Sequence, residues 1–219
     1  MHETTQEEVR AMGTADLEPR RVPSQDRSRK RVDAILDGLA ELLVERGFEA
    51  INTHHVAERA NVPVGTLYQF FPNKYALVSA LSRRYIERYG DILQESLSFD
   101  ESHVKDEHIL DQYSEAVANV MFQDKALAVL WAVMLATPEL RPIQVAGLKM
   151  GHSLLMSLLK SRFGHLDENT LEKIATTIYR ASYAMLYSAC QNPDEDKDAA
   201  LEELKRLQNA YLKSYLKND

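Results

Sequence analysis

The sequence predicts an all-α protein of about nine helices, and three observations support this class. Glycine and proline are scarce, with 8 and 7 residues in a chain of 219. Ala, Leu, Glu, Lys and Arg are abundant, and these residues favour helices over sheets. Apolar residues recur three and four positions apart along most of the chain, which is the spacing of one helix face.

Composition also indicates the cellular compartment in which the protein works. The single cysteine, Cys190, cannot form an internal disulfide, which favours a reducing cytoplasm. No apolar run approaches the roughly 18 residues that a membrane-spanning helix needs. The N-terminal stretch MHETTQEEVRAMG is polar and acidic, unlike a secretory signal peptide. We therefore expect a soluble cytoplasmic protein that does not contact a membrane.

Charge is distributed unevenly along the chain, although the net charge is −7. Residues 20–88 contain 12 Lys and Arg against 8 Asp and Glu, whereas residues 89–219 contain 13 against 20. The basic part includes the stretch RSRKR, from Arg27 to Arg31. Such asymmetry indicates a nucleic-acid-binding end, although a solvated basic face would have the same composition.

The N-terminal part is expected to hold an arm followed by four helices. Residues 1–25 show no apolar periodicity and are predicted to be a disordered arm. The helices are predicted from Asp26 or Ser28 to Gly47, over 54–60, from about 64 to 70, and from Pro72-Asn73 to about Leu97. Gly47 is placed to cap the first helix at its C-terminus, and Thr53 to cap the second at its N-terminus.

Five more helices are predicted after the connection SFDESHVKDE. They are expected at about 104–122, 124–136, 139–163, 168–191 and 195–217. Asp167 is predicted to be an N-cap, with Leu166 and Leu171 placed to form a hydrophobic staple around it.

The stretch NVPVGTLYQFFPNK, from Asn61 to Lys74, has the pattern of a helix-turn-helix unit. Asn61 tolerates the left-handed backbone that suits a reversal between two short helices. Pro63 suits the first turn of the helix that follows. Leu67 and Phe70 are expected to point inward and to hold this helix from behind.

The outward residues of the same helix suit a DNA major groove. They are Val64, Gly65, Thr66, Tyr68 and Gln69. Glycine permits close approach, the two hydroxyls can donate to phosphates, and the glutamine can meet a base edge. Lys74, in the first turn of the next helix, and Arg29, in the basic cluster, can attract phosphates. The alternative is an ordinary helical hairpin with a polar outer face.

The segment GFEAINTHHVAERANVPVGTLYQFFPNKYALVSAL, from Gly47 to Leu81, resembles the DNA-binding signature of the TetR family of bacterial transcriptional regulators. The GTLY core, the aromatic residue after it and Lys74 carry the resemblance, which covers about residues 28–81. It implies a homodimer with an N-terminal three-helix DNA-binding domain and a C-terminal ligand-binding domain whose last two helices form the interface. These domains would be 26–73 and 74–219.

By position, the resemblance implies that Thr53 and His54 contact DNA from the second helix, beside the outward row of the third helix and Lys74. The pattern departs from the family at two places. Pro63 stands where a serine cap is common, and Gln69 with its neighbour stands where an aromatic-histidine or His-Tyr pair is common.

Other chemistry has little support in the sequence. Glu-x-x-His, His-Glu-x-x-His and Cys-x-x-Cys are absent, so neither a di-iron bundle nor a common zinc motif is predicted. His103 and Glu107 could share a helix face, but a solvated helix start explains them better. No glycine-rich phosphate loop or nucleophile–base spacing indicates an enzyme. We expect no catalytic activity, no metal and no cofactor.

The C-terminal part is rich in Met and Tyr and contains the single Trp, residues that can line an adaptable apolar pocket. We hypothesise that a small apolar or aromatic effector is bound by Trp131, Met134, Tyr179 and Tyr183, although each also suits an ordinary core. The last two predicted helices are amphipathic and could pair with those of a second copy, or pack on their own subunit.

These features together predict a homodimeric, ligand-responsive transcriptional repressor that binds a palindromic operator and is released by its effector. Two recognition helices about 34–36 Å apart can read successive major grooves of one DNA duplex. The alternative is a helical protein-interaction module without specific DNA binding, with a small enzyme a distant third.

Overall fold

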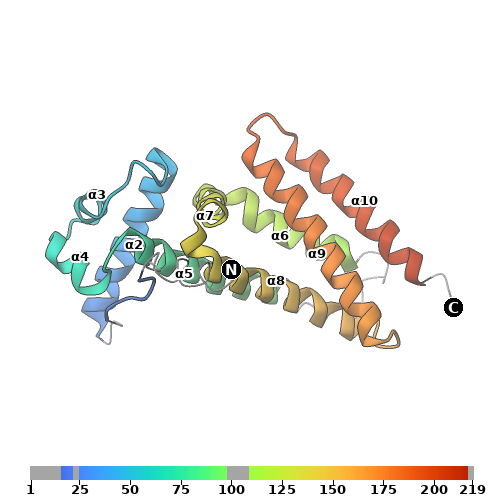
Figure 1. Ribbon diagram of the computed structural model, residues 1–219. Coiled ribbons are helices and arrows are strands. Elements are labelled where there is room, and N and C mark those ends of the chain that lie inside the picture. The colour runs from blue at the N-terminus through green and yellow to red at the C-terminus, as the bar shows by residue number, and fades with distance from the viewer. Residues whose placement is uncertain (1–15, 22–24, 98–108, 217–219) are drawn as a thin grey trace, which may run out of the picture. The chain divides into compact units, whose positions relative to one another are not determined.

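The computed structural model describes residues 16–21, 25–97 and 109–216, and these form an all-α fold (Figure 1). The elements are α2 (Asp26–Arg46), α3 (Thr53–Arg59), α4 (Val64–Phe70), α5 (Lys74–Leu97), α6 (Ile109–Gln123), α7 (Lys125–Ala136), a 3₁₀ turn (Pro138–Leu140), α8 (Arg141–Arg162), α9 (Glu168–Gln191) and α10 (Lys197–Leu216). The predicted fold class is confirmed by these nine α-helices of the described ranges. Most of the predicted arm, the predicted connection before α6, His103 and Glu107 lie outside those ranges.

The chain divides into two compact units. The first comprises the residues up to Arg84 together with 129–144, and the second comprises 85–128 and 145–219. Helices α2, α3 and α4 therefore belong to the first unit, and α6, α9 and α10 to the second.

The first unit is built on α2, which packs against α3, and α3 in turn packs against α4. The inner face of α2 is apolar and buried, and includes Ile35, Leu36, Leu39, Leu42 and Leu43. The helix ends as predicted at Gly47, which has a φ of 72° and donates its N–H to the carbonyl of Leu43 at 3.0 Å. Glycine adopts this left-handed conformation at no steric cost.

A charged contact fixes α3 on α2. Arg59 Nη1 lies 2.9 Å from Glu41 Oε2, and Arg59 Nη2 lies 2.6 Å from Glu45 Oε2. The hydrogen bond from Arg59 lowers the pKa of Glu45. The backbones approach closely at Gly38, where a Cβ atom would lie 3.1 Å from Arg59 Cγ. The end of α3 is thus held against the middle of α2.

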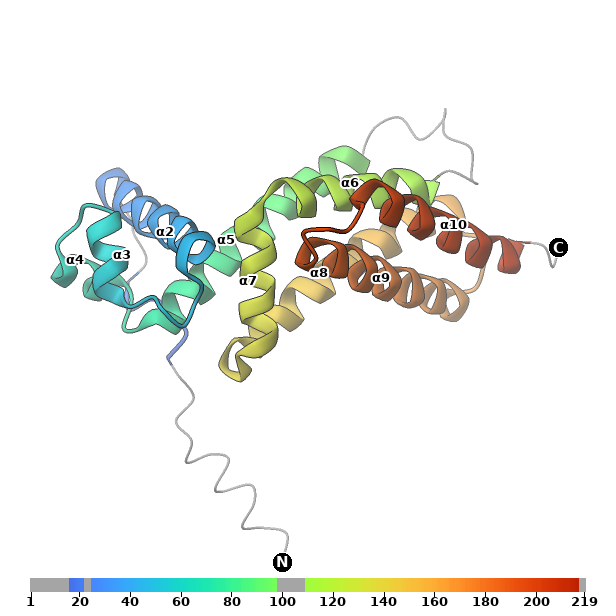
Figure 2. The same ribbon diagram turned by 90° about the horizontal axis from the view of Figure 1, so that it is seen from above.

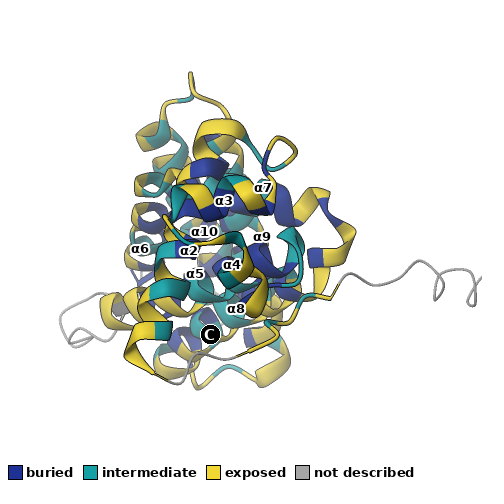
Figure 3. Cartoon of the chain, turned by 90° about the vertical axis from the view of Figure 1, so that its left-hand side faces the viewer, coloured by how far each residue is buried: buried dark blue, intermediate teal, exposed yellow. Residues whose placement is uncertain are grey.

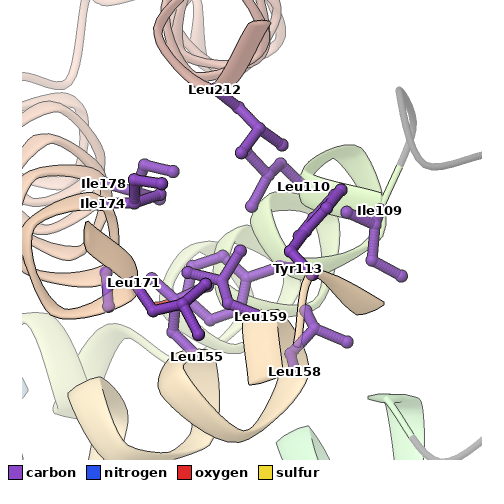
Figure 4. Packing of buried hydrophobic residues seen from close by; sticks show 12 residues of the cluster. Ile109, Leu110, Tyr113, Leu155, Leu158, Leu159, Leu171, Ile174, Ile178 and Leu212 are labelled. Atoms are coloured by element: carbon purple, nitrogen blue, oxygen red, sulfur yellow. The ribbon is translucent and has the colours of Figure 1, made fainter. Parts of the chain in front are cut away.

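The second unit has its own apolar core, to which α6, α8, α9 and α10 contribute (Figure 4). Helix α9 packs against α10, and α6 packs against both of them (Figure 2). The predicted cap of α9 is confirmed, because Asp167 Oδ1 accepts from the N–H of Thr170 at 3.1 Å. Leu171 belongs to the core cluster and Leu166 packs against it, in agreement with the predicted hydrophobic staple.

A buried polar network crosses this core. Ser114 Oγ of α6 donates to Gln208 Oε1 of α10 at 2.5 Å, and Gln208 Nε2 donates to Ser182 Oγ of α9 at 2.6 Å. Ser182 Oγ donates onward to the carbonyl of Ile178 at 2.8 Å. All three polar residues are at most 1% exposed. The network therefore joins three helices through groups that have no access to water.

Candidate nucleic-acid interface

Helix α3 begins one residue earlier than expected, which corrects the role of Thr53. The N-cap is Asn52, whose extended backbone lets its Oδ1 accept from the N–H of His55 at 3.0 Å. Thr53 is the first helical residue and is only 8% exposed. An asparagine is as good a cap as a threonine, so capping does not need the Thr53 hydroxyl, which faces α4 instead.

The turn between α3 and α4 has the predicted left-handed residue. Asn61 has a φ of 52°, and its N–H donates to the carbonyl of Glu58 at 3.0 Å. Val62 donates to the carbonyl of Ala57 at 3.0 Å. Pro63 lies just before α4, at the N-cap rather than within the first turn. The two short helices are therefore joined without an extended loop.

Helix α4 has an apolar inner side and a mainly polar outer side. Leu67 and Phe70 are buried, as predicted. Gly65, Tyr68 and Gln69 are exposed, while Val64 and Thr66 are half-buried. Figure 3, which views the chain from the side of α3 and α4, shows exposed residues on both helices. A Cβ atom at Gly65 would meet nothing within 4 Å, so packing within this unit does not require glycine there.

The hydroxyls of Thr53 and Tyr68 join α3 to α4. Their oxygens lie 2.8 Å apart, and Tyr68 is 37% exposed. Whichever hydroxyl donates, the other keeps its own proton for an outside acceptor. Because Thr53 is buried and Tyr68 is not, Tyr68 is the member that can donate outward. Sequence reasoning placed both residues on the interface but did not anticipate the bond between them.

Three further residues are predicted to contact DNA. His54 is exposed on α3. Arg29 is exposed on α2, with Nη1 3.9 Å from Asp26 Oδ1. Lys74 begins α5, and its ammonium lies 4.2 Å from the centroid of the Phe48 ring and 3.9 Å from a carboxylate oxygen of Glu49. The Lys74 side chain is 26% exposed and that of Glu49 is 93% exposed, and an ion pair at that distance is weak.

The residues predicted for the effector lie in both units. Tyr179 and Tyr183 of α9 line an open groove of about 540 Å³ between α8 and α9. The groove is also lined by Val145, Leu148, Lys149, His152, Ser153, Glu172, Thr176 and Arg180. Burial raises the pKa of the Tyr179 hydroxyl, which keeps it neutral. Met134 is buried and Trp131 half-buried on the part of α7 that belongs to the first unit.

Other kinds of site find no support in the described ranges. No group of three or more His, Cys, Asp or Glu residues is arranged there to hold a metal ion. Within the same residues, no single helix is long and apolar enough to cross a membrane. The bent pair of α6 and α7 passes such a test, by length and composition alone.

Two short helices joined by a left-handed turn, with a buried inner side and a glycine-bearing outer side, define a helix-turn-helix protein. Two family models match this chain: "Bacterial regulatory proteins, tetR family" over residues 35–81, and "Tetracyclin repressor-like, C-terminal domain" over residues 107–212. The chain belongs to the TetR family.

Two curated relatives are similar over less than a third of this chain. The transcriptional repressor KstR of Rhodococcus jostii is 46% identical over 63 residues, which is 28% of this chain and 30% of that protein. KstR of Mycolicibacterium smegmatis is 48% identical over 58 residues, or 26% of this chain and 28% of that protein. The matched segment thus spans less than a third of these relatives.

Solved structures are similar over most of the chain. A TetR-family transcriptional regulator from Streptomyces coelicolor is 28% identical, with a TM-score of 0.54 over 84% of this chain and 98% of that one. The fatty acid degradation regulator FadR from Bacillus halodurans is 20% identical, with a TM-score of 0.68 over 82% and 94%. The second likeness concerns the fold alone.

Proposed function

We propose that this protein is a ligand-responsive transcriptional repressor that binds a palindromic operator as a homodimer. The observation that carries the proposal is the outer side of α4, where Gly65 is open to close approach and Tyr68 and Gln69 are exposed. The TetR-family relatives named as transcriptional repressors support it. Gly65 lets the backbone approach DNA, Thr66 and Tyr68 donate to phosphates, and Gln69 meets a base edge.

Selection of bound fragments from random DNA, followed by sequencing, tests this function directly. We expect enrichment of an inverted repeat, because a two-fold symmetric dimer presents two copies of α4 to one duplex. Binding without any enriched sequence, or no binding at low salt, would favour the helical interaction module instead.

Variants at Gln69 and Lys74 separate recognition of the DNA sequence from non-specific attraction to the phosphates. We expect Gln69→Ala to change the preferred base at one position of each half-site, with a loss of about 1–3 kcal/mol against the selected operator. Lys74→Ala should weaken binding to all sequences and reduce the slope of log affinity against log salt by about one. Titrations at several salt concentrations measure both. Equal losses on all sequences for Gln69→Ala would contradict its assigned role.

The dimer is proposed to form through α9 and α10. Leu207 on α10 is 47% exposed in the single chain, and Ala210, one turn further on, is also exposed. We expect Leu207→Glu to shift the protein from dimer to monomer at micromolar concentration in sedimentation. Gln112→Glu is the control, because Gln112 is exposed on α6, outside the two helices proposed for the interface. A wild-type monomer at that concentration would rule out the proposed dimer.

The effector is proposed to be a small apolar or aromatic molecule. Tyr179 and Tyr183 are its proposed contacts in the groove of the second unit, and Trp131 and Met134 are tested separately as contacts in the first unit. The effector acts by favouring a conformation in which the two copies of α4 are wrongly spaced for the operator. Such an effector needs different affinities for the two states, typically by 1–3 kcal/mol. Trp131 is the only tryptophan of the sequence, so quenching of its fluorescence by candidate ligands tests this binding.

A further inference from the structure

A short segment near the N-terminus contacts the end of α4. The backbone N–H of Arg20 donates to the carbonyl of Phe70 at 2.8 Å, and Arg20 Nη1 donates to the carbonyl of Tyr68 at 3.4 Å. We name this segment, Asp16–Arg20, the N-terminal clasp. It belongs to the same compact unit as α4.

The clasp is also attached to α5. Arg83 donates through both terminal nitrogens to the carboxylate of Glu18, with Nη1 3.0 Å from Oε2. This hydrogen bonding lowers the pKa of Glu18. Asn73 Nδ2 donates to the carbonyl of Asp16 at 3.1 Å, while Asn73 Oδ1 accepts from the N–H of Ala76 at 2.9 Å. The clasp thus bridges the end of α4 and the first turns of α5.

These contacts stabilise the C-terminal end of α4. The last four carbonyls of any helix lack partners within it, and a helix of 7 residues is too short to be stable alone. Arg20 supplies donors to two of those carbonyls and places a positive charge at the negative end of the helix dipole. The last turn that is stabilised in this way contains Tyr68 and Gln69.

We propose that Glu18 and Arg20 are positioning residues for α4, and that the clasp fixes the last turn of α4 for sequence-specific DNA binding. The inference rests on the proposed function. Neither residue needs to touch DNA: Arg20 holds the carbonyls of α4, and Glu18 holds the clasp to Arg83.

The direction in which Glu18→Gln changes operator affinity distinguishes a positioning role of Glu18 from a purely electrostatic one. Removing a negative charge beside a DNA-binding face strengthens DNA binding if only electrostatics acts. If the clasp positions α4, Glu18→Gln weakens binding to the selected operator, by about three- to tenfold, or about 0.7–1.4 kcal/mol. Binding to random DNA, which depends on phosphates, should not weaken. The ratio of the two affinities therefore reports positioning.

Arg20 and Arg21 provide a matched pair. Both arginines are exposed, and Arg21 directly follows the clasp. Each alanine variant loses one positive charge. We expect Arg20→Ala to lower the operator-to-random affinity ratio, and Arg20→Lys to recover part of it because a cation remains at the helix end. Arg21→Ala should leave the ratio unchanged. Equal ratios for Arg20→Ala and Arg21→Ala, or operator binding by Glu18→Gln as tight as that of wild type, overturn the proposal.

Amide hydrogen exchange of the free protein distinguishes failure of the clasp from failure of the proposed function. The N–H groups of α4 should exchange faster in Glu18→Gln and Arg20→Ala than in wild type, with the unfolding temperature unchanged. If wild type selects no DNA sequence, the proposed function fails, and the positioning role fails with it even where α4 exchange is faster. If wild type selects an operator but α4 exchange is the same in all variants, only the clasp is overturned.

Discussion

Gly65→Ala is expected to reduce affinity for the selected operator at least tenfold, about 1.4 kcal/mol, while the protein stays as stable as wild type or becomes slightly more stable. In the free chain a Cβ atom at Gly65 would meet nothing within 4 Å, so the added methyl group causes no clash. Replacing a helical glycine by alanine raises stability by up to about 1 kcal/mol. A loss of DNA binding would therefore report contact with DNA alone.

The measurement is a DNA titration combined with chemical denaturation of the same two proteins. Gly65→Leu should reduce binding further, because a larger side chain holds the α4 backbone further from the duplex. Gly38→Ala is a useful contrast, since a Cβ at Gly38 would lie 3.3 Å from the backbone nitrogen of Ala60. Gly38→Ala is therefore expected to lower the free energy of unfolding, unlike Gly65→Ala. Unchanged operator affinity in Gly65→Ala would show that α4 does not lie against DNA at this point.

Gln208→Ala is expected to destabilise the protein by about 2–4 kcal/mol, which combines a cavity with a buried hydroxyl left without its partner. Gln208 links Ser114 of α6 to Ser182 of α9, at 2.5 and 2.6 Å. In the single variant, the Ser114 proton loses its acceptor in a place that water does not reach. Urea or thermal unfolding of the full chain measures the loss.

Replacing all three polar residues of the network should lower the free energy of unfolding far less than replacing Gln208 alone. The triple variant Ser114→Ala, Ser182→Ala, Gln208→Leu leaves no polar side chain unpaired at these positions, so we expect its stability within about 1 kcal/mol of wild type. Gln112→Ala on the exposed side of α6 is the control and should change stability by less than about 0.5 kcal/mol. A triple variant less stable than Gln208→Ala would contradict this account.

Much of the fold could be predicted because its signals are local. The bounds of α9 were predicted as observed, since Asp167 caps it and an Asn-Pro pair follows its end. The turn at Asn61 and the inward side of α4 were likewise readable, because a left-handed residue and apolar spacing depend on near neighbours.

Sequence-based predictions are wrong or incomplete in two situations. In one, two neighbouring residues suit the same role; in the other, the contacting residues are far apart in the sequence. Asn52 and Thr53 are both good caps, and only the backbone direction decides for Asn52. On α10, the apolar spacing leaves packing on the same subunit and pairing with a second copy both open, and it gives no signal for the buried Gln208. No spacing rule links Glu18 to Arg83, which are 65 positions apart.

The bond between Thr53 and Tyr68 has a consequence for how a signal could reach DNA. Together with the Arg59 contacts to Glu41 and Glu45, which hold α3 on α2, it links α4 through α3 to α2. A helix fastened in this way cannot tilt alone without breaking those bonds. If an effector regulates DNA binding, we therefore expect α2, α3 and α4 to move together as one rigid body. The distance between the two copies of α4 in the dimer would change, while the shape of each DNA-binding unit would not.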